Sequence, residues 1–319
     1  MKKIKFVIVS SRQFSGGAIV LHALCKYLAE DGYDAKIMHS DVFIYRRFHK
    51  IQFWIEWIAY SLKDIFKEIA VKLLGEKGRK YGEFFKGYYD ESVKGYKKTR
   101  WPFVDKNTVA VYPDIVFGNP LRSKNVVRWL LYYNRFTKYE RAYGKNDMFF
   151  AYRSIFNDEK RNPEKRLLCL SYFDLDLYKR TNFGERSGTC YIIRKGKQRS
   201  DLPVSFDGVI IDDLPEEEKV KVFNQSKYCV SYDPQTAYSD LAALCGCISV
   251  IVPEPGKTRE DYRKQEDKSY GVAFGFAPDE IEYAEKTAAY LPAYFTSINE
   301  NGKKAARGFA EECETYFGI

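Results

Sequence analysis

The chain has 319 residues and a formal net charge of +9, and 45% of its residues are hydrophobic while 30% are charged. This length favours two domains over one compact core, and this composition excludes an intrinsically disordered chain. No run of about 18 apolar residues occurs, which argues against a membrane-spanning helix. The seven cysteines are scattered without regular spacing, which excludes a disulfide framework and leads us to expect a cytoplasmic protein.

The first 40 residues predict a strand, a glycine-containing loop, a helix and a second strand. The run IKFVIV is continuous and β-rich, as expected of a strand buried on both faces of a parallel sheet. Gly16 and Gly17 then open a stretch with apolar residues at helical spacing, which Gly32 is expected to end. DAKIMHS follows as a short strand. This order is the βαβ opening of an α/β domain.

Residues 42–100 are basic and aromatic. They hold 14 Lys and Arg against 7 Asp and Glu, and 14 aromatic residues. Apolar residues recur at helical spacing from Phe48 to Leu73, which predicts a long amphipathic helix or a pair of helices. We expect a helical insertion that packs on the sheet. A surface for anionic lipid head groups and a nucleic-acid patch are the alternatives, and the interleaved acidic residues argue against nucleic acid.

The middle of the chain continues the α/β pattern. We predict strands at NTVAVYP, DMFFAY and RLLCLSYF, and a helix at SKNVVRWLLYY. These elements complete a first Rossmann-like domain with a parallel sheet, at residues 1–165.

A second α/β pattern begins at about Lys165 and defines a domain at residues 166–319. Strands are predicted at GTCYIIRKG, GVIID, YCVSY, CISVIVP and YGVAFG, and helices at LPEEEKVKVFNQ and directly after YCVSY. Two further helices are expected at about Asp279–Tyr290 and about Gly302–Phe317. The last of them is free to return to the N-terminal domain.

Gly16 and Gly17 lie where a ligand can approach the backbone. They follow the first strand and open a helix, where glycines admit a phosphate or sugar and the helix N-terminus supplies N–H donors. The loop is not a G-x-G-x-x-G fingerprint, so it gives NAD little support.

Four basic residues follow the strand in YIIRKGKQR. Arg194 and Lys195 stand directly after the apolar run, where a guanidinium fork and an ammonium point charge suit a diphosphate. Lys197 and Arg199 fit a solvated basic turn better.

The stretch SYDPQTAYSDLAALCGC, beginning at Ser231, crowds the entrance of a predicted helix with polar groups. Asp233 and Pro234 have the pattern of an N-cap followed by proline at the first helical position. Thr236 and Ser239 are three residues apart and should share one helix face. Two hydroxyls there favour phosphate binding, with Asp233 turned towards neutral hydroxyls. Tyr232 and Tyr238 complete the polar entrance.

No metal site is expected. Cys245-Gly246-Cys247 lacks the further ligands that a tetrahedral site needs, and the three histidines are spread along the chain.

With these residues assembled, the chain resembles bacterial glycosyltransferases of GT-B fold, especially those of capsular and lipopolysaccharide biosynthesis. The resemblance covers most of the chain outside residues 42–100. The motifs that carry it are SGGAIVLHALCKYLAEDGYDAKIM, YPDIVFGNPLRSKNVVRWLLYYN and NQSKYCVSYDPQTAYSDLAALCGCISVIVPE. It implies two facing Rossmann-like domains, with the nucleotide-sugar donor bound mainly by the C-terminal domain and the acceptor by the N-terminal domain. It also implies no cofactor and no essential metal.

One departure limits the resemblance. In the large retaining group, seven residues separate two paired glutamates; Asp233 falls on the first of these positions and Leu241 on the second. The first acidic residue contacts the donor sugar in that group and the second contacts the ribose. Ribose binding in this chain must therefore come from elsewhere, and retention of stereochemistry does not carry over.

The expected function is transfer of a sugar from a nucleotide-sugar donor to a growing surface glycan or glycolipid. Arg194, Lys195 and the helix start at Thr236 would stabilise the leaving diphosphate. An inverting reaction needs a base, for which Asp114, just after the strand in NTVAVYP, is the candidate. The predicted donor-binding residues are Gly16, Gly17, Arg194, Lys195, Tyr232, Asp233, Thr236 and Ser239.

Two alternative functions belong to other classes. One is a nucleotide-sugar epimerase of the same architecture, which would use the donor groups without an acceptor. The other is a non-enzymatic protein that binds a membrane surface or a polyanion through residues 42–100. We expect a cytoplasmic location, with peripheral attachment to the inner face of the cell membrane as the alternative, and no nucleic-acid partner.

Overall fold

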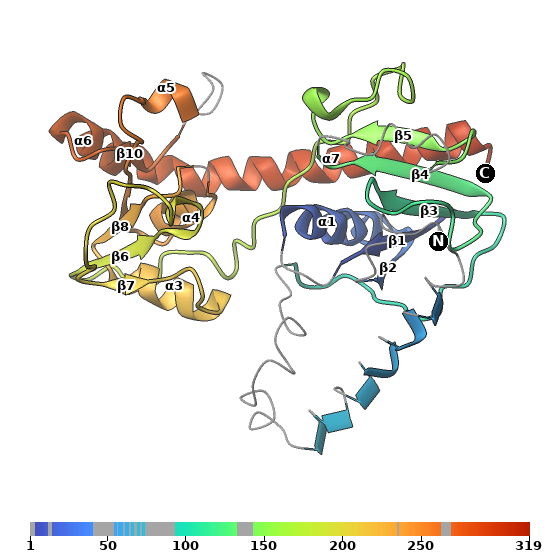
Figure 1. Ribbon diagram of the computed structural model, residues 1–319, viewed down its shortest axis with the longest axis horizontal. Coiled ribbons are helices and arrows are strands. Elements are labelled where there is room, and N and C mark those ends of the chain that lie inside the picture. Colours follow the sequence, from blue (N-terminus) through green and yellow to red (C-terminus); the bar gives the residue numbers. More distant parts are fainter. Residues whose placement is uncertain are drawn as a thin grey trace. The chain divides into compact units, whose positions relative to one another are not determined.

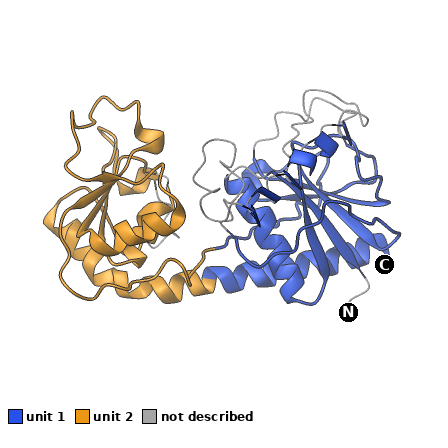
Figure 2. Cartoon of the chain, turned by 90° about the horizontal axis from the view of Figure 1, so that it is seen from below, with its two compact units in different colours: residues 1–172, 298–319 blue, residues 173–297 orange. Residues whose placement is uncertain are grey.

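The computed structural model describes residues 4–11, 15–40, 93–132, 143–234, 236–262 and 269–319, together with scattered positions between 54 and 73. The chain divides into two compact units, drawn in different colours in Figure 2. Unit 1 comprises Met1–Tyr172 and Ile298–Ile319, and unit 2 comprises Phe173–Ser297. Each unit contains a five-stranded parallel sheet with helices. The predicted mixed α/β fold with two parallel sheets is confirmed.

Unit 1 has the strand order β2-β1-β3-β4-β5, and every strand pair in it is parallel (Figure 1). Its elements are β1 (Lys5–Ser10), α1 (Gly16–Glu30), β2 (Asp34–His39), β3 (Thr108–Pro113), β4 (Asn125–Leu130), β5 (Met148–Ala151), the 3₁₀ turn η3 (Ser154–Phe156) and the later part of α7 (Leu291–Phe317). The order reverses between β1 and β3, which makes that point the topological switch of the sheet.

Both faces of this sheet are buried, which explains its continuous apolar runs. On one face, Phe6 belongs to a cluster that includes Leu24 of α1 and Phe309 of α7. On the other face, Val7 packs in a cluster with Trp57. Successive strand residues point to opposite faces, so neighbouring apolar residues serve different clusters.

The helix predicted at SKNVVRWLLYY is wrong, because Asn125–Leu130 forms strand β4 and every one of its residues is buried. An apolar run this short does not distinguish a helix from a strand buried on both faces. Arg128, which is 0% exposed, is tolerated there because it forms an ion pair with Asp147 at 2.7 Å. The strand predicted at RLLCLSYF is also wrong, since only Leu167 makes an isolated bridge, to Ala151.

Unit 2 repeats the strand order of unit 1, as β10-β9-β8-β6-β7, again with parallel pairs (Figure 1). Its elements are β6 (Thr189–Ile192), η4 (Arg194–Gly196), β7 (Val209–Ile210), α3 (Glu216–Gln225), β8 (Tyr228–Ser231), α4 (Tyr238–Leu244), β9 (Ile248–Ile251), α5 (Arg259–Tyr262), β10 (Val272–Phe274), α6 (Pro278–Thr287), η5 (Ala288–Tyr290) and the start of α7. The switch point of this sheet lies between β6 and β8.

The helix predicted from about Gly302 starts earlier, at Leu291, and runs from unit 2 into unit 1. In unit 1 it passes close to the backbone of Ser171: a Cβ on Gly302 would lie 2.9 Å from the Ser171 carbonyl oxygen and 2.9 Å from the Tyr27 ring. Glycine in the middle of this helix therefore allows a close approach that a side chain would block.

The predicted helical insertion lies mostly outside the described residues, but the positions described between 54 and 73 are helical. Trp57 and Ser61 are buried, at 2% and 5% exposure. Trp54 is half-buried and packs against the same cluster as Trp57. Seven other large apolar residues described there are exposed: Ile55, Ile58, Leu62, Ile65, Phe66, Ile69 and Leu73. For these seven residues, which we call the apolar stripe, the prediction of packing on the sheet is wrong.

Two further findings concern the chain as a whole. Within the described ranges, no helix is both long and apolar enough to cross a membrane. All seven cysteines are free thiols, and all but Cys169 are buried.

Candidate functional site

The ends of β6 and β8 lie side by side at the switch point of unit 2. The two strands pair up to Ile192, whose carbonyl accepts the N–H of Tyr232 at 2.8 Å. Arg194 and Lys195 lie in η4, directly beyond β6, and Tyr232 and Asp233 directly follow β8. The structure therefore brings four of the predicted donor residues to one sheet edge. In open α/β sheets, this edge at the switch point is where ligands bind.

The turn that carries the two cations packs tightly on the loop after β8. Gly196 is buried, and a Cβ on it would lie 2.8 Å from the Tyr232 carbonyl carbon and closer still to the oxygen. Arg194 and Lys195 themselves are exposed. Among the residues that the structure describes, neither makes a hydrogen bond or an ion pair. Two cations are thus held on a well-packed turn without an ion-pair partner among the described residues.

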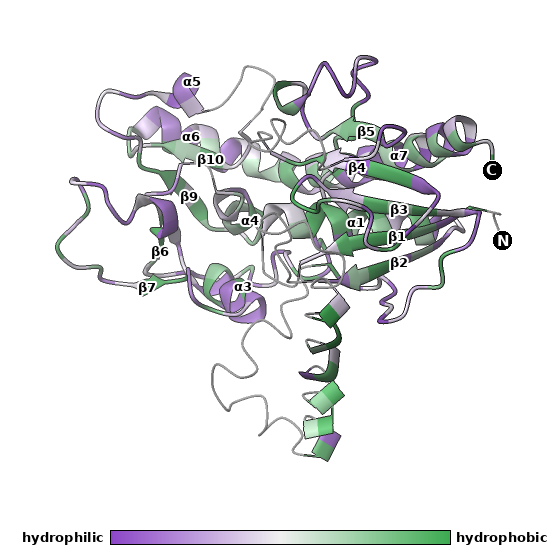
Figure 3. Cartoon of the chain, turned by 45° about the vertical axis from the view of Figure 1, so that its right-hand side comes forward, coloured by the Kyte–Doolittle hydropathy of each residue, from purple (hydrophilic) through white to green (hydrophobic). Residues whose placement is uncertain are grey.

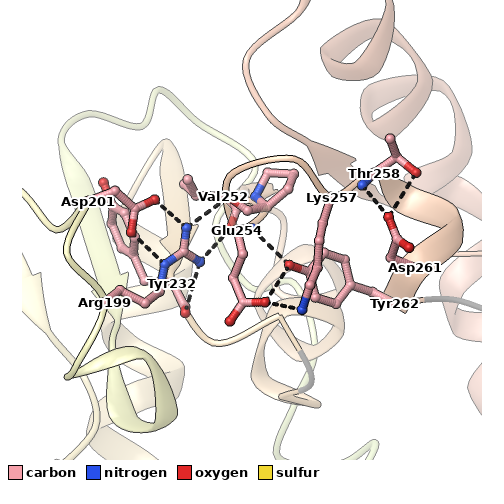
Figure 4. Close-up of polar contacts among 10 residues, drawn as sticks. Arg199, Asp201, Tyr232, Val252, Glu254, Lys257, Thr258, Asp261 and Tyr262 are labelled. Atoms are coloured by element: carbon pink, nitrogen blue, oxygen red, sulfur yellow. Dashed lines mark hydrogen bonds and ion pairs between the residues drawn. The ribbon is translucent and has the colours of Figure 1, made fainter.

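Arg199 is not the solvated residue that the sequence predicted; its side chain is only 8% exposed. Its guanidinium donates to the carbonyls of Val252 at 2.7 Å and Pro253 at 2.8 Å, and forms an ion pair with Asp201 at 2.6 Å (Figure 4). A weaker bond at 3.3 Å reaches the Tyr232 carbonyl. Arg199 therefore links the ends of β8 and β9, and its guanidinium is engaged in bonds within the protein.

The same edge continues after β9, where a second set of bonds orders the loop (Figure 4). The hydroxyl of Tyr262 accepts the N–H of Glu254 at 2.8 Å and donates to the Glu254 carboxylate at 3.2 Å. Lys257 also pairs with that carboxylate. Lys257 therefore has an ion-pair partner within the protein, whereas Arg194 and Lys195 have none in the part of the chain that the structure describes.

The entrance of α4 differs from the prediction. The helix starts at Tyr238, so Asp233 and Pro234 lie in the preceding loop and the predicted N-cap at Asp233 is wrong. Thr236 also precedes the helix, and its hydroxyl accepts the N–H of Tyr238 at 3.3 Å. Ser239 is 0% exposed, and its hydroxyl has no hydrogen-bond partner among the described atoms. Thr236 is half-buried, whereas Ser239 is fully buried in the interior.

Tyr238 has a structural role. Its hydroxyl donates to the Glu216 carboxylate at 2.7 Å and accepts from the Lys219 ammonium at 3.0 Å. Tyr178 donates to the same carboxylate, and burial together with Glu216 raises the pKa of Tyr178. These contacts join the start of α4 to the start of α3. One of the polar groups at the entrance is thereby explained by packing alone.

Sequence reasoning missed a pocket of about 480 Å³ on one face of the unit 2 sheet. Its lining residues are Thr189, Tyr191, Tyr228 and Val230 from β6 and β8, Pro203, Ser205, Phe206 and Asp207 from the β6–β7 connection, and Tyr232 and Phe276 from loops. A βαβ unit ordinarily covers this face with a helix. Here β6 and β7 are joined by η4 and a loop, which leaves the face open. The sequence between these two strands lacks an amphipathic run, and this absence could have indicated that no helix covers the face.

In unit 1, Asp114 follows β3 at the switch point and is 5% exposed. Its carboxylate accepts the N–H of Leu131 at 3.3 Å, and its carbonyl accepts the Tyr143 hydroxyl at 2.8 Å. Burial raises the pKa of Asp114 to about 6. A carboxyl group with a raised pKa suits proton abstraction near neutral pH.

Gly16 and Gly17 are the first two residues of α1, in unit 1, whereas the other predicted donor residues belong to unit 2. Ser15 caps the helix by accepting the N–H of Ala18 at 3.2 Å. A Cβ on Gly17 would lie 3.4 Å from the Leu131 side chain. Because Leu131 also donates to Asp114, the start of α1 and Asp114 share one edge of the unit 1 sheet.

Two histidines that are distant in sequence also meet in unit 1. The Nε2 atoms of His22 and His39 are 3.3 Å apart, and His22 stacks on Tyr96 with ring centroids 4.6 Å apart. Burial, with a smaller effect from Lys98, lowers the pKa of His22 to about 4. Over the described part of the chain, no group of three or more His, Cys, Asp or Glu side chains is arranged to hold a metal ion.

No protein-family model matches this chain, and no curated protein sequence matches it.

Proposed function

We propose that the protein is a glycosyltransferase that moves a sugar from a nucleotide-sugar donor to a surface glycan or glycolipid. The main support is the pair of exposed cations, Arg194 and Lys195, at the switch point of a parallel sheet in unit 2. In the GT-B arrangement that we propose, unit 2 binds the donor and unit 1 binds the acceptor.

The two cations would act on the leaving group. The bond between the anomeric carbon and the diphosphate oxygen breaks, and negative charge accumulates on the nucleoside diphosphate. A guanidinium fork and an ammonium group stabilise that charge. Neither side chain has a partner among the described residues, so donor binding breaks no bond that the structure describes.

Asp114 is the proposed base for an inverting transfer. It would take the proton of the acceptor hydroxyl, whose oxygen then forms the new bond to the anomeric carbon. With a pKa of about 6, this carboxyl is ionised at pH 7 yet retains more proton affinity than an ordinary aspartate.

The donor site can be tested by calorimetry with UDP, GDP and CMP. We expect one nucleotide to bind, and both Arg194→Ala and Lys195→Ala to weaken it by about tenfold or more. Lys221→Ala changes an exposed lysine of α3 and is the matched control. Indifference to every nucleotide, or binding that neither variant weakens, would overturn the proposal.

The reaction type needs a second measurement. Release of free nucleoside diphosphate only when an acceptor is added supports a transferase. Conversion of the donor sugar into its epimer without an acceptor supports the epimerase instead.

A second candidate function, attachment to an anionic membrane surface, is favoured by the apolar stripe. Its seven residues are 37% to 79% exposed and recur mostly every three or four positions. The described pieces of this helix, light blue in Figure 1, are largely green for hydrophobic in Figure 3. Lys63 and Lys72 are also exposed there. We propose that the stripe enters the acyl boundary while lysines contact anionic head groups.

Vesicle sedimentation tests this second proposal. We expect binding to vesicles of phosphatidylglycerol and phosphatidylcholine, and a loss of about tenfold for Leu62→Glu with Ile69→Glu. Leu167→Glu, at a residue that is 51% exposed outside the stripe, is the control. Equal binding of the stripe variant and the parent protein would contradict a membrane role.

A further inference from the structure

We infer that the pocket on the face of the unit 2 sheet holds the nucleoside part of the donor, with the diphosphate leading to Arg194 and Lys195. This inference rests on the proposed function, because it assigns a ligand group to a site that the transferase would use. It adds four residues on which the sequence pattern gave no information: Tyr191, Phe206, Asp207 and Tyr228.

The size and the lining of the pocket suit a flat ring. A volume of about 480 Å³ lies in the range of small-molecule sites. The rings of Tyr191 and Phe206 meet edge to face with centroids 4.7 Å apart, and Phe206 meets Tyr232 in the same manner at 6.2 Å. Each ring thus has a set orientation, and aromatic side chains held in this way are the usual stacking platform for nucleobases.

The charge of the lining indicates a neutral group. Among the described residues that line the pocket, only Asp207 is charged, and its carboxylate accepts the Tyr191 hydroxyl. Burial and the Asp207 carboxylate raise the pKa of Tyr191 to about 12, so the phenol stays protonated. A phosphate would be repelled by this carboxylate, whereas ribose hydroxyls and base N–H groups would donate to it. The hydroxyls of Thr189 and Ser205 provide further hydrogen-bonding groups.

Tyr232 belongs to the lining of the pocket and also contacts the cationic turn. Its carbonyl is the group on which Gly196 packs. Gly196 ends the three-residue turn that begins with Arg194 and Lys195. The pocket and the turn that carries the two exposed cations therefore share a contact with Tyr232. A nucleoside diphosphate has that division into a neutral ring system and an anionic end.

The test compares nucleosides with their diphosphates. We would measure uridine, guanosine, cytidine and the three diphosphates by ligand-observed NMR and calorimetry. Phe206→Ala should weaken a nucleoside and its diphosphate alike, by about tenfold. Arg194→Ala should weaken the diphosphate alone. Ser205→Tyr fills the pocket from an exposed loop position and should repeat the Phe206→Ala result without removing a packed ring.

Phe183→Ala is the matched control, because Phe183 is 76% exposed in unit 2 and does not line the pocket. Diphosphate binding that needs Arg194 but is unchanged in both pocket variants overturns the inference and leaves the transferase proposal standing. Nucleoside binding that needs the pocket, without sugar transfer to any acceptor, overturns the transferase proposal and leaves the pocket as a nucleoside site without a donor role. Absence of binding by all six compounds overturns both.

Discussion

Gly196 packs on the carbonyl group of Tyr232, and this contact sets the position of the cationic turn in unit 2. A Cβ on residue 196 would stand 2.8 Å from the carbonyl carbon of Tyr232. The obstacle is the backbone directly after β8, which the Tyr232 N–H ties to the Ile192 carbonyl, so it cannot move aside as a flexible side chain would. The placement of Arg194 and Lys195 beside the end of β8 therefore requires glycine at position 196.

Gly196→Ala should destabilise unit 2 by about 1–3 kcal/mol, because the added methyl group overpacks the turn. Urea unfolding followed by fluorescence measures this change. Gly308→Ala is the control: a Cβ there has nothing within 4 Å, and the residue lies inside α7. The control should raise the stability by about 0.5–1 kcal/mol, as alanine does in a helix. Equal unfolding midpoints for the two variants would contradict the proposed packing.

Arg194 and Arg199 should respond to substitution in opposite ways. Arg199→Ala should cost about 2–4 kcal/mol, because it leaves the carbonyls of Val252 and Pro253 without their donor and Asp201 without its partner. Arg194→Ala should change the stability by less than about 0.5 kcal/mol, since the side chain is exposed and unpaired among the described residues. Thermal unfolding and nucleotide titration of both variants check this contrast. A nucleotide-binding defect in a stable Arg199→Ala variant would show that our structural assignment of Arg199 is wrong.

Asp114→Asn should stabilise the protein at pH 7.5 but not at pH 4. The folded-state pKa of Asp114, about 6, lies above its unfolded value of 3.8. The resulting stabilisation is fully present below pH 4 and is lost as the pH rises through 6. The loss is on the order of 3 kcal/mol. Asparagine can still accept the Leu131 N–H and does not ionise. The difference in unfolding free energy between variant and parent should therefore grow between pH 4 and pH 7.

The same variant tests the proposed base. Asp114→Asn should lower sugar transfer by at least about 100-fold while nucleotide affinity stays unchanged. A stable variant with full transfer activity would exclude Asp114 as the base without affecting the proposed donor site.

Tyr238→Phe should lower the stability by about 1 kcal/mol, because it removes the hydroxyl that bonds Glu216 and Lys219. Its nucleotide affinity should match that of the parent protein. Chemical denaturation and calorimetry measure the two quantities. A variant that keeps its stability but loses nucleotide affinity would show that Tyr238 belongs to the candidate donor site.

Several elements were predictable because their signals are local. The run that became β8 is short and apolar, and α3 begins after Pro215 with three glutamates in its first turn. β4 was taken for a helix because a short apolar run contains no information on length or period. Arg128 is a charged residue within this buried strand, which made the strand hard to recognise. Its charge is compensated by Asp147, which is 19 positions away.

The candidate site was only partly predictable. Arg194 and Lys195 follow β6 as the pattern indicated, since the residues after a parallel strand must lie at its carboxyl edge. The pairing of Thr236 with Ser239 failed because α4 begins two residues after Thr236 and turns Ser239 inward. Local capping patterns do not encode where tertiary packing allows a helix to begin.

By itself, the sequence determined two parallel α/β units and a cationic turn after β6. Apolar runs, helix caps and turn residues are patterns that extend over only a few residues, so they can be recognised without the tertiary structure. Only the tertiary structure decided that the Arg199 guanidinium is engaged in bonds within the protein and that Asp114 is buried enough for its pKa to rise. It also decided that β6, β8 and their neighbouring loops line a pocket. Each of these depends on contacts between segments far apart in the chain. A side chain's solvation and partners, which set its chemistry, are properties of those contacts.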